Sequence, residues 1–121
     1  MSTTIKFSAD IVPVPFKRPG SNRKRRYDPP DYAAFKAALG YVARRTMNGR
    51  APLDCPLKFV LDVFNDLPPA SRNFGDWDNH AKATCDALNG ICFSDDRQII
   101  DGRVRLHRGN PHVEILLEAI T

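Results

Sequence analysis

The sequence lacks the segments that would place the protein in or across a membrane. No stretch of its 121 residues approaches the ~20 consecutive apolar residues of a transmembrane helix. The first seven residues also lack the charged-then-apolar pattern of a signal peptide. We therefore expect a cytoplasmic protein with no membrane partner. Cysteine is scarce as well: Cys55, Cys85 and Cys92 form no Cys-x-x-Cys pair, which argues against a zinc site or a disulfide framework.

Common cofactor and nucleophile motifs are missing too. Neither Gly-x-x-x-x-Gly-Lys-Ser/Thr nor Gly-x-Gly-x-x-Gly occurs, so no nucleotide cofactor is expected, and no serine-nucleophile motif is present. His80, His107 and His112 do not have the spacing of a metal-ligand pair. His80 lies near an acidic stretch, and we expect it either at the surface or just behind the residues that act directly.

What the sequence does contain is a concentration of carboxylates between residues 76 and 96. Five aspartates and one lysine fall in this stretch of an otherwise basic protein: Asp76, Asp78, Lys82, Asp86, Asp95 and Asp96. Asp76 and Asp78 would point to the same side of an extended segment, and Lys82 would share a helical face with Asp78. Two hard oxygen ligands beside a cation favour a divalent metal such as Mg²⁺.

Less specific interpretations of the same residues stay open. Asp78 could cap a helix while the other aspartates are solvated surface. Lys82 could form only an exposed ion pair with Asp78 or Asp86, worth about 0.5 kcal/mol. Trp77, the only tryptophan, would face away from the paired aspartates in an extended segment, and we expect it to be a packing anchor that fixes their direction.

Charge is distributed unevenly along the chain. The net charge is +4, yet residues 17–50 alone carry +8 and the remainder −4. Most of the excess lies in a Gly-, Pro- and Ser-containing loop whose cations are Lys17, Arg18, Arg23, Lys24, Arg25 and Arg26. Such a basic arm beside an acidic site suits an enzyme that acts on the phosphate backbone of a nucleic acid, although a charge run can also be merely solvated. Phe16 and Tyr27 flank the loop and could either stack on bases or pin the loop to the core.

Apolar periodicity predicts a β-α-β-α-β-β order in one α+β domain covering residues 1–121. Strands are expected at about 5–11, 57–64, 100–107 and 113–117. One helix should begin with Asp31 as its N-cap and end at Asn48-Gly49, and a second should run from near Asp78 to Asn89-Gly90. The elements fit a small mixed or antiparallel sheet with the helices on one face. The last two strands are predicted to form a hairpin across the turn at 109–111.

With these residues in view, the chain resembles the RusA-type Holliday junction resolvases, small endodeoxyribonucleases of bacteria and their prophages. The resemblance rests on Asp76-x-Asp78-Asn79-x-x-Lys82, on Asp86-Ala87-Leu88 and on Asp95-Asp96 followed by Gln98-Ile99; Pro13-Val14-Pro15 adds a weaker match. It implies that Asp76, Asp78 and Asp96 bind Mg²⁺, for which Mn²⁺ can substitute, and that Lys82 is the family's essential lysine. It also implies a homodimer acting on branched DNA. Where some members carry several arginines before the first aspartate, this chain has only Arg72.

Three functions are consistent with these residues. The first is a Mg²⁺-dependent endonuclease that resolves four-way DNA junctions by paired, symmetric cuts in recombination and repair. The second is a less selective nuclease for branched or flap DNA, serving a phage or prophage. The third is a DNA-binding module without catalysis, which the carboxylates disfavour because anions facing phosphate weaken simple binding.

Overall fold

The computed structural model describes residues 3–17, 20–21 and 26–120. In chain order its elements are β1 (Thr4–Ala9), β2 (Gly20–Ser21), β3 (Arg26–Tyr27), α1 (Pro30–Met47), β4 (Leu57–Asn65), α2 (Trp77–Leu88), the 3₁₀ turn η1 (Asp96–Gln98), β5 (Ile99–Arg108) and β6 (His112–Ala119). Apart from the two-residue strands β2 and β3 and the short η1, this confirms the predicted order and the α+β class. In the described part of the chain, no helix is both long and apolar enough to cross a membrane.

The main sheet is mixed, with strand order β1-β6-β4-β5. Strand β6 is antiparallel to both β1 and β4, whereas β4 and β5 run parallel. The predicted hairpin of the last two strands is therefore wrong, because β4 lies between β5 and β6. The turn at 109–111 passes over the end of β4, where the Phe64 ring stacks between His107 and His112 at centroid distances of 4.5 and 4.1 Å.

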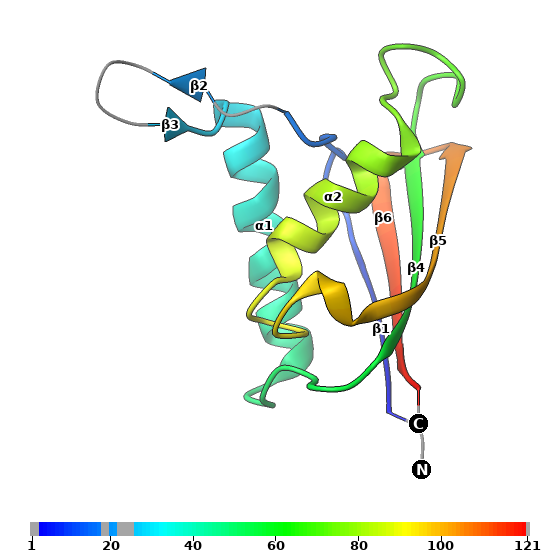
Figure 1. Cartoon of the computed structure of the whole chain (residues 1–121). Helices are drawn as coiled ribbons and strands as arrows, with labels where there is room; N and C mark the ends of the chain where they lie inside the picture. Colours follow the sequence, from blue (N-terminus) through cyan, green and yellow to red (C-terminus); the bar gives the residue numbers. More distant parts are fainter. Residues whose placement is uncertain (1–2, 18–19, 22–25, 121) are drawn as a thin grey trace.

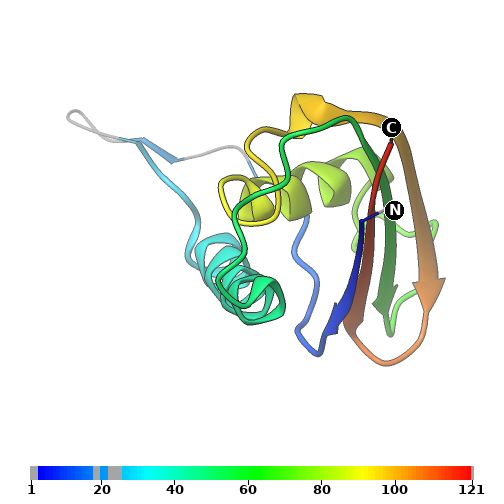
Figure 2. The same cartoon turned by 90° about the horizontal axis from the view of Figure 1, so that it is seen from below.

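One face of the sheet is covered by helices and the other is open (Figures 1 and 2). The side chains of β4 that point towards α1 and α2 are almost completely buried: Leu57, Phe59, Leu61 and Val63 are at most 2% exposed. These four residues occupy alternate positions, so they share one face of the sheet, since successive side chains of a strand point to opposite faces. The helices thus lie on the side where the carboxylate-rich segment must fold.

Helix α1 begins two residues earlier than the sequence indicated. Its N-cap is Pro29 and Pro30 opens the first turn, so the prediction of Asp31 as N-cap is wrong. Proline suits this position because its missing N–H would have no helical partner there. The Asp31 carboxylate instead accepts from the backbone N–H of Tyr32 and pairs with Lys17. The predicted end is confirmed: Asn48 has the left-handed conformation (φ 49°) and donates its N–H to Arg44.

Candidate metal and DNA-binding site

A sharp bend delivers the chain to the N-terminus of α2. Gly75 has φ 91°, and a Cβ atom there would come within 2.8 Å of Pro15 Cγ, so only glycine fits this turn. Asp76 follows as the N-cap of α2 in an extended conformation, and its carboxylate makes no capping hydrogen bond. The cap of this helix is therefore Asp76 and not Asp78. Asp76 is exposed and lies at the positive end of the helix dipole, where a negative charge is favourable.

His80 stabilises this bend from the interior of the protein. It is 2% exposed, and its Nε2 lies 2.7 Å from the carbonyl oxygen of Phe74. Burial lowers the pKa of His80, more than the Phe74 carbonyl and Asp76 raise it, so the neutral ring donates Nε2–H to that carbonyl. The surface alternative for His80 is thus wrong. This histidine positions the segment just before Asp76 instead of contacting solvent.

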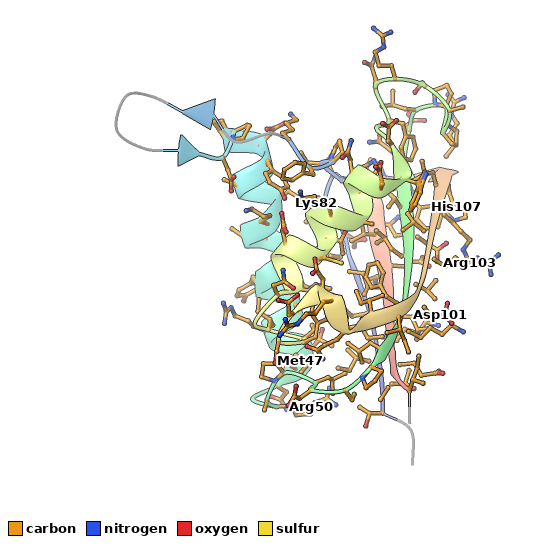
Figure 3. The ribbon with its side chains drawn as sticks, viewed as in Figure 1. Met47, Arg50, Lys82, Asp101, Arg103 and His107 are labelled. Atoms are coloured by element: carbon orange, nitrogen blue, oxygen red, sulfur yellow. The ribbon has the colours of Figure 1, made fainter. Side chains whose placement is uncertain are left out.

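Asp78 and Lys82 lie one helical turn apart and are both exposed. Asp78 Oδ1 accepts from the backbone N–H of Asn79 at 2.9 Å. The Lys82 ammonium lies 4.0 Å from the centroid of the Phe16 ring, on the side of α2 that faces α1 (Figure 3). Among the described residues Lys82 makes no ion pair, so the interpretation of Lys82 as a simple surface salt bridge is not supported. Its charge is held by an aromatic face and stays available to an anion.

Phe16 is fixed between the two helices. Its ring packs edge-on against Tyr32 at a centroid distance of 5.7 Å, and its backbone N–H donates to Asn79 at 2.9 Å. Of the two alternatives for this residue, pinning the basic loop to the core is the one observed. Tyr32 also donates its hydroxyl to Asp86 at 2.7 Å, and burial followed by this bond raises the pKa of Tyr32. Asp86 is therefore engaged in joining α1 to α2.

The adjacent residues Asp95 and Asp96 have different roles. Asp95 caps η1: its carboxylate accepts from the N–H of Arg97 at 3.0 Å, and its own N–H donates to the Gln98 side chain at 2.9 Å. The Gln98 amide in turn donates to the carbonyls of Leu53 and Cys55, at 2.8 and 3.0 Å, which fastens the turn to the preceding segment. Asp95 is thus used structurally. This leaves Asp96 as the carboxylate of the pair that can serve a ligand.

Asp96 carries more negative charge around it than its cationic neighbour offsets. Partial burial raises the pKa of Asp96, and the carboxylates of Asp95 and Asp86 raise it further, while Lys82 alone opposes them. The same cluster reaches Cys85, where burial and then Asp96 and Asp86 raise the thiol pKa to about 12. Asp96 and Lys82 are therefore electrostatic neighbours, although they are 14 positions apart in the sequence.

A hollow of about 370 Å³ opens between α2 and β5, and both Lys82 and Asp96 line it. Trp77 lines it as well and is 63% exposed, so the prediction that Trp77 is a packing anchor is wrong. The segment is not extended at this point, because α2 already begins at Trp77, and the first residue of a helix at the protein surface keeps much of its side chain in solvent. The remaining lining residues are mostly apolar: Phe59, Ala81, Cys85, Ile99, Gly102, Arg103 and Val104.

The donor chemistry of the predicted metal ligands suits a hard divalent cation. Asp76, Asp78 and Asp96 offer only carboxylate oxygens, and Asp96 sits in a surplus of negative charge that a cation would relieve. Within residues 3–17, 20–21 and 26–120, no three His, Cys, Asp or Glu side chains gather closely enough to enclose an ion. The structure thus brings together Lys82, Asp86 and Asp96 and puts Asp76 at the helix start, without a closed three-carboxylate cage.

The predicted DNA-binding cations divide into three groups. Arg18, Arg23, Lys24 and Arg25 lie outside the described residues, and of Arg26 only the backbone, in β3, is described. Lys17 is described and pairs with Asp31. Arg72 is exposed in the loop before α2 and makes no ion pair with any described residue. Because like charges repel one another, the sequence also predicts that residues 17–26 are mobile without DNA; this prediction falls largely on residues outside the described part of the chain.

Sequence reasoning missed how the polar row of β5 is used. Arg105 and His107 both bind Asp62 of β4, a residue that the alternation of that strand could have marked as a partner. Arg108 lies 3.7 Å from Asp66. Of the arginines on this row, only Arg103 has no carboxylate partner among the described residues, and it extends from the outer edge of the sheet (Figure 3).

Comparison with known proteins shows which family the chain belongs to. The chain is similar to a Bacillus subtilis (strain 168) protein described as uncharacterized protein YqaN, with 27% identity over 138 aligned positions that cover 97% of each chain. A family model described as endodeoxyribonuclease RusA matches residues 10–118, a span that includes every element from α1 to β5 and all of the carboxylates discussed above. The chain therefore belongs to the RusA family of endodeoxyribonucleases.

Proposed function

We propose that this chain is a Mg²⁺-dependent endonuclease that cuts Holliday junctions symmetrically as a homodimer, in recombination and repair. The observation that carries the proposal is that the adjacent residues Asp95 and Asp96 have different roles. The Asp95 carboxylate caps η1. The Asp96 carboxylate lies near two other carboxylates, Asp95 and Asp86, and near one cation, Lys82. Together with Asp76 and Asp78 at the start of α2, this is a carboxylate set suited to a metal ion and to a phosphate held by it.

In this proposal Asp76, Asp78 and Asp96 would hold Mg²⁺, with Mn²⁺ as a substitute. The ion would supply charge neutralisation at the scissile phosphate and a more acidic bound water. Lys82 provides a fixed cation for the negative charge that develops during phosphodiester hydrolysis. Its position over the Phe16 ring restrains it, and a restrained cation loses less freedom when the phosphate arrives. His80 and Gly75 fix the conformation of the bend that precedes Asp76.

Binding to DNA would rest on the arm of residues 17–26 and on Arg72. Phe16 lies beside Lys82 at the start of the arm, so a DNA backbone bound by the arm would pass close to Lys82. A four-way junction has two-fold symmetry, and a homodimer would place one site on each of two opposed strands. Phosphate contacts of this kind position the protein but do not read sequence.

The test compares four-way junctions, flaps and linear duplexes of the same sequence, with Mg²⁺, with Mn²⁺ and with chelator. We expect paired cuts in the junction with either metal and none with chelator. Asp76→Asn should abolish cutting while junction affinity stays equal or increases, because the change removes an anion that faces phosphate. Equal cutting of flaps and junctions would support the alternative of a less selective phage or prophage nuclease. Absence of cutting with every metal would leave a DNA-binding module.

The arm is tested by the salt dependence of binding. Neutralising Arg23, Lys24, Arg25 and Arg26 together should flatten the slope of log affinity against log salt, since each lost phosphate contact removes about 0.9 from it for B-DNA. Junction and duplex binding should weaken alike, so the preference for the junction survives. An unchanged slope would transfer the DNA-facing role to other cations, with Arg103 the first to examine.

A further inference from the structure

Trp77 occupies an unusual position for the chain's only tryptophan. Its side chain is 63% exposed although the residue stands between the two aspartates of the proposed metal site. Large aromatic side chains are usually buried, and an exposed one beside a functional group more often contacts a ligand. Trp77 forms one wall of the hollow between α2 and β5, with Ala81 and Cys85 following it at helical spacing.

Strand β5 forms the opposite wall of the hollow, and a glycine on this strand widens the hollow because it has no side chain. Gly102 lies on the strand where the side chain of another residue would point towards α2, between Ile99 and Val104 in the lining. Its backbone needs no left-handed conformation, and a Cβ atom there would meet only Ile99 Cγ2, at 3.6 Å. The backbone therefore tolerates a side chain at Gly102. The glycine leaves room for something flat to enter beside Trp77.

The charged residues that line the hollow indicate which kind of ligand it could bind. Lys82 and Asp96, both proposed to act on the scissile phosphate, line the hollow, so a strand bound there must pass its mouth. Arg103 lines it too and has no carboxylate partner among the described residues. The interior is mostly apolar, and the charged residues of the lining are the cations Lys82 and Arg103 and the carboxylate of Asp96. This combination suits a nucleotide, whose base is a flat aromatic ring and whose phosphate is an anion.

We propose that this hollow is a subsite for an unstacked nucleobase next to the cleaved phosphate, with Trp77 as its stacking platform. This inference rests on the proposed function, since it takes the DNA strand from Asp96 and Lys82. Its volume of about 370 Å³ falls within the range of ~300–1,000 Å³ typical of small-molecule sites. In the open form of a junction, the base pairs at the exchange point lack a stacking neighbour on one side, so moving one base into the hollow costs less there than in a continuous duplex.

The fluorescence of Trp77 tests this directly, because the chain has no other tryptophan. Asp76→Asn protein, which does not cut, is titrated with a four-way junction, and with junctions that carry one abasic nucleotide at each position around the exchange point. Binding is followed separately by the anisotropy of a label on a distal arm. We expect the intact junction to quench Trp77 emission and one abasic position to abolish the quenching while the junction stays bound.

Two variants and a matched control complete the experiment. Trp77→Ala should lower kcat/KM on the junction by about fivefold to 150-fold, the range expected for losing one base–aromatic stack. Gly102→Val, which fills the hollow and leaves Trp77 in place, should lower it similarly without changing the melting temperature. Tyr41→Ala, which removes an equally exposed aromatic side chain from α1, should have no effect on cutting.

Two results would overturn the subsite. One is quenching that every abasic junction reproduces, with Trp77→Ala as active as wild type. The other is a change in Trp77 emission on diluting the protein without DNA, which would assign the hollow to a second copy of the chain. Both differ from a failure of the proposed function, in which the wild-type protein cuts no junction with Mg²⁺ or Mn²⁺.

Discussion

Two aspartates of this protein lie in opposite electrostatic surroundings. On the open face of the sheet, Asp62 accepts from two guanidinium nitrogens of Arg105, at 2.6 and 2.9 Å, and from Nε2 of His107 at 2.7 Å. Burial acts to raise the pKa of Asp62, but the hydrogen bonds from Arg105 and His107 outweigh it and lower that pKa. At Asp96, burial and two neighbouring carboxylates raise the pKa and only Lys82 opposes them.

The difference separates a structural charge from one that is set up for binding. The fold itself supplies the positive charge that Asp62 needs, in a bidentate pair that joins β4 to β5. Such a carboxylate gains nothing from a further cation. Asp96 lacks that compensation, so a cation from outside would stabilise it. A perturbed pKa alone does not mark a functional site, because structural ion pairs perturb pKa values as well; the direction of the shift and its cause distinguish these two.

The largest expected effect is on the rate of DNA cutting, when Asp96 and Asp62 are each replaced by asparagine. Asp96→Asn should reduce the rate of junction cutting by two or more orders of magnitude, the scale on which the loss of one electrostatic stabiliser acts. Its free energy of unfolding should be unchanged or slightly higher, since a like charge is removed. Asp62→Asn should keep the cutting rate per folded molecule. The measurement is single-turnover cleavage with saturating Mg²⁺ alongside urea unfolding; equal rates for the two variants would contradict the division.

The next effect concerns the one cation of the acidic site. Lys82→Met keeps most of the packing against Phe16 but removes the charge, and cutting should fall by about 10²- to 10³-fold. Lys36 offers a matched control, because its ammonium also lies over an aromatic ring, 4.7 Å from the Tyr32 centroid, and pairs with Asp28 at 2.6 Å. Lys36→Met should leave single-turnover cutting within about twofold of wild type, as expected of a mainly structural pair. A comparable loss in both variants would mean that packing, and not charge, matters at Lys82.

A smaller effect should appear in stability at the Asp62 site. Removing one partner of a largely buried, hydrogen-bonded charge leaves the other less satisfied, and Asp62→Asn should lower the free energy of unfolding by about 1–3 kcal/mol at neutral pH. Because the folded pKa of Asp62 is lowered, this stabilisation is present above the unfolded pKa of ~3.9 and is lost as pH falls through the folded pKa. Urea unfolding of wild type and variant between pH 7 and pH 2 should therefore converge at the acid end. A constant difference across that range would exclude the charge of Asp62 as its origin.

The elements of the fold were predictable because each depends on local pattern. Alternation in β4 and β6 and the apolar stripe of α1 are read directly from the order of residues. The pairing of the strands was not predictable, since a short turn at 109–111 is compatible either with a hairpin or with a connection that crosses the end of β4. Only the structure shows the central place of β4: Val60 and Asp62 point to the open face of the sheet yet are only 9% exposed, as expected of a strand with neighbours on both sides.

The candidate site was predictable in its residue types but not in its geometry. Asp76, Asp78, Lys82 and Asp96 stand out by charge and spacing, whereas their arrangement depends on where α2 begins. That start, one residue before Asp78, makes Asp76 the N-cap and exposes Trp77. The role of Gly102 could not be inferred, because a glycine in a strand has meaning only through what packs opposite it.

The smallest expected effect sharpens the comparison to adjacent residues. Asp95→Asn should lower cutting by less than about tenfold, because Asp95 acts through the cap of η1, which asparagine preserves. Asp95→Ala removes the cap and should cost about 0.5–2 kcal/mol of stability. Cutting should then fall further, since the turn that carries Asp96 loosens. Asp95→Ser discriminates between the two roles: serine keeps a capping oxygen without the charge, so its cutting rate should match that of wild type. If Asp95→Ser instead lost as much activity as Asp96→Asn, Asp95 would itself be a metal ligand, and the assignment of the two residues would have to be reversed or shared.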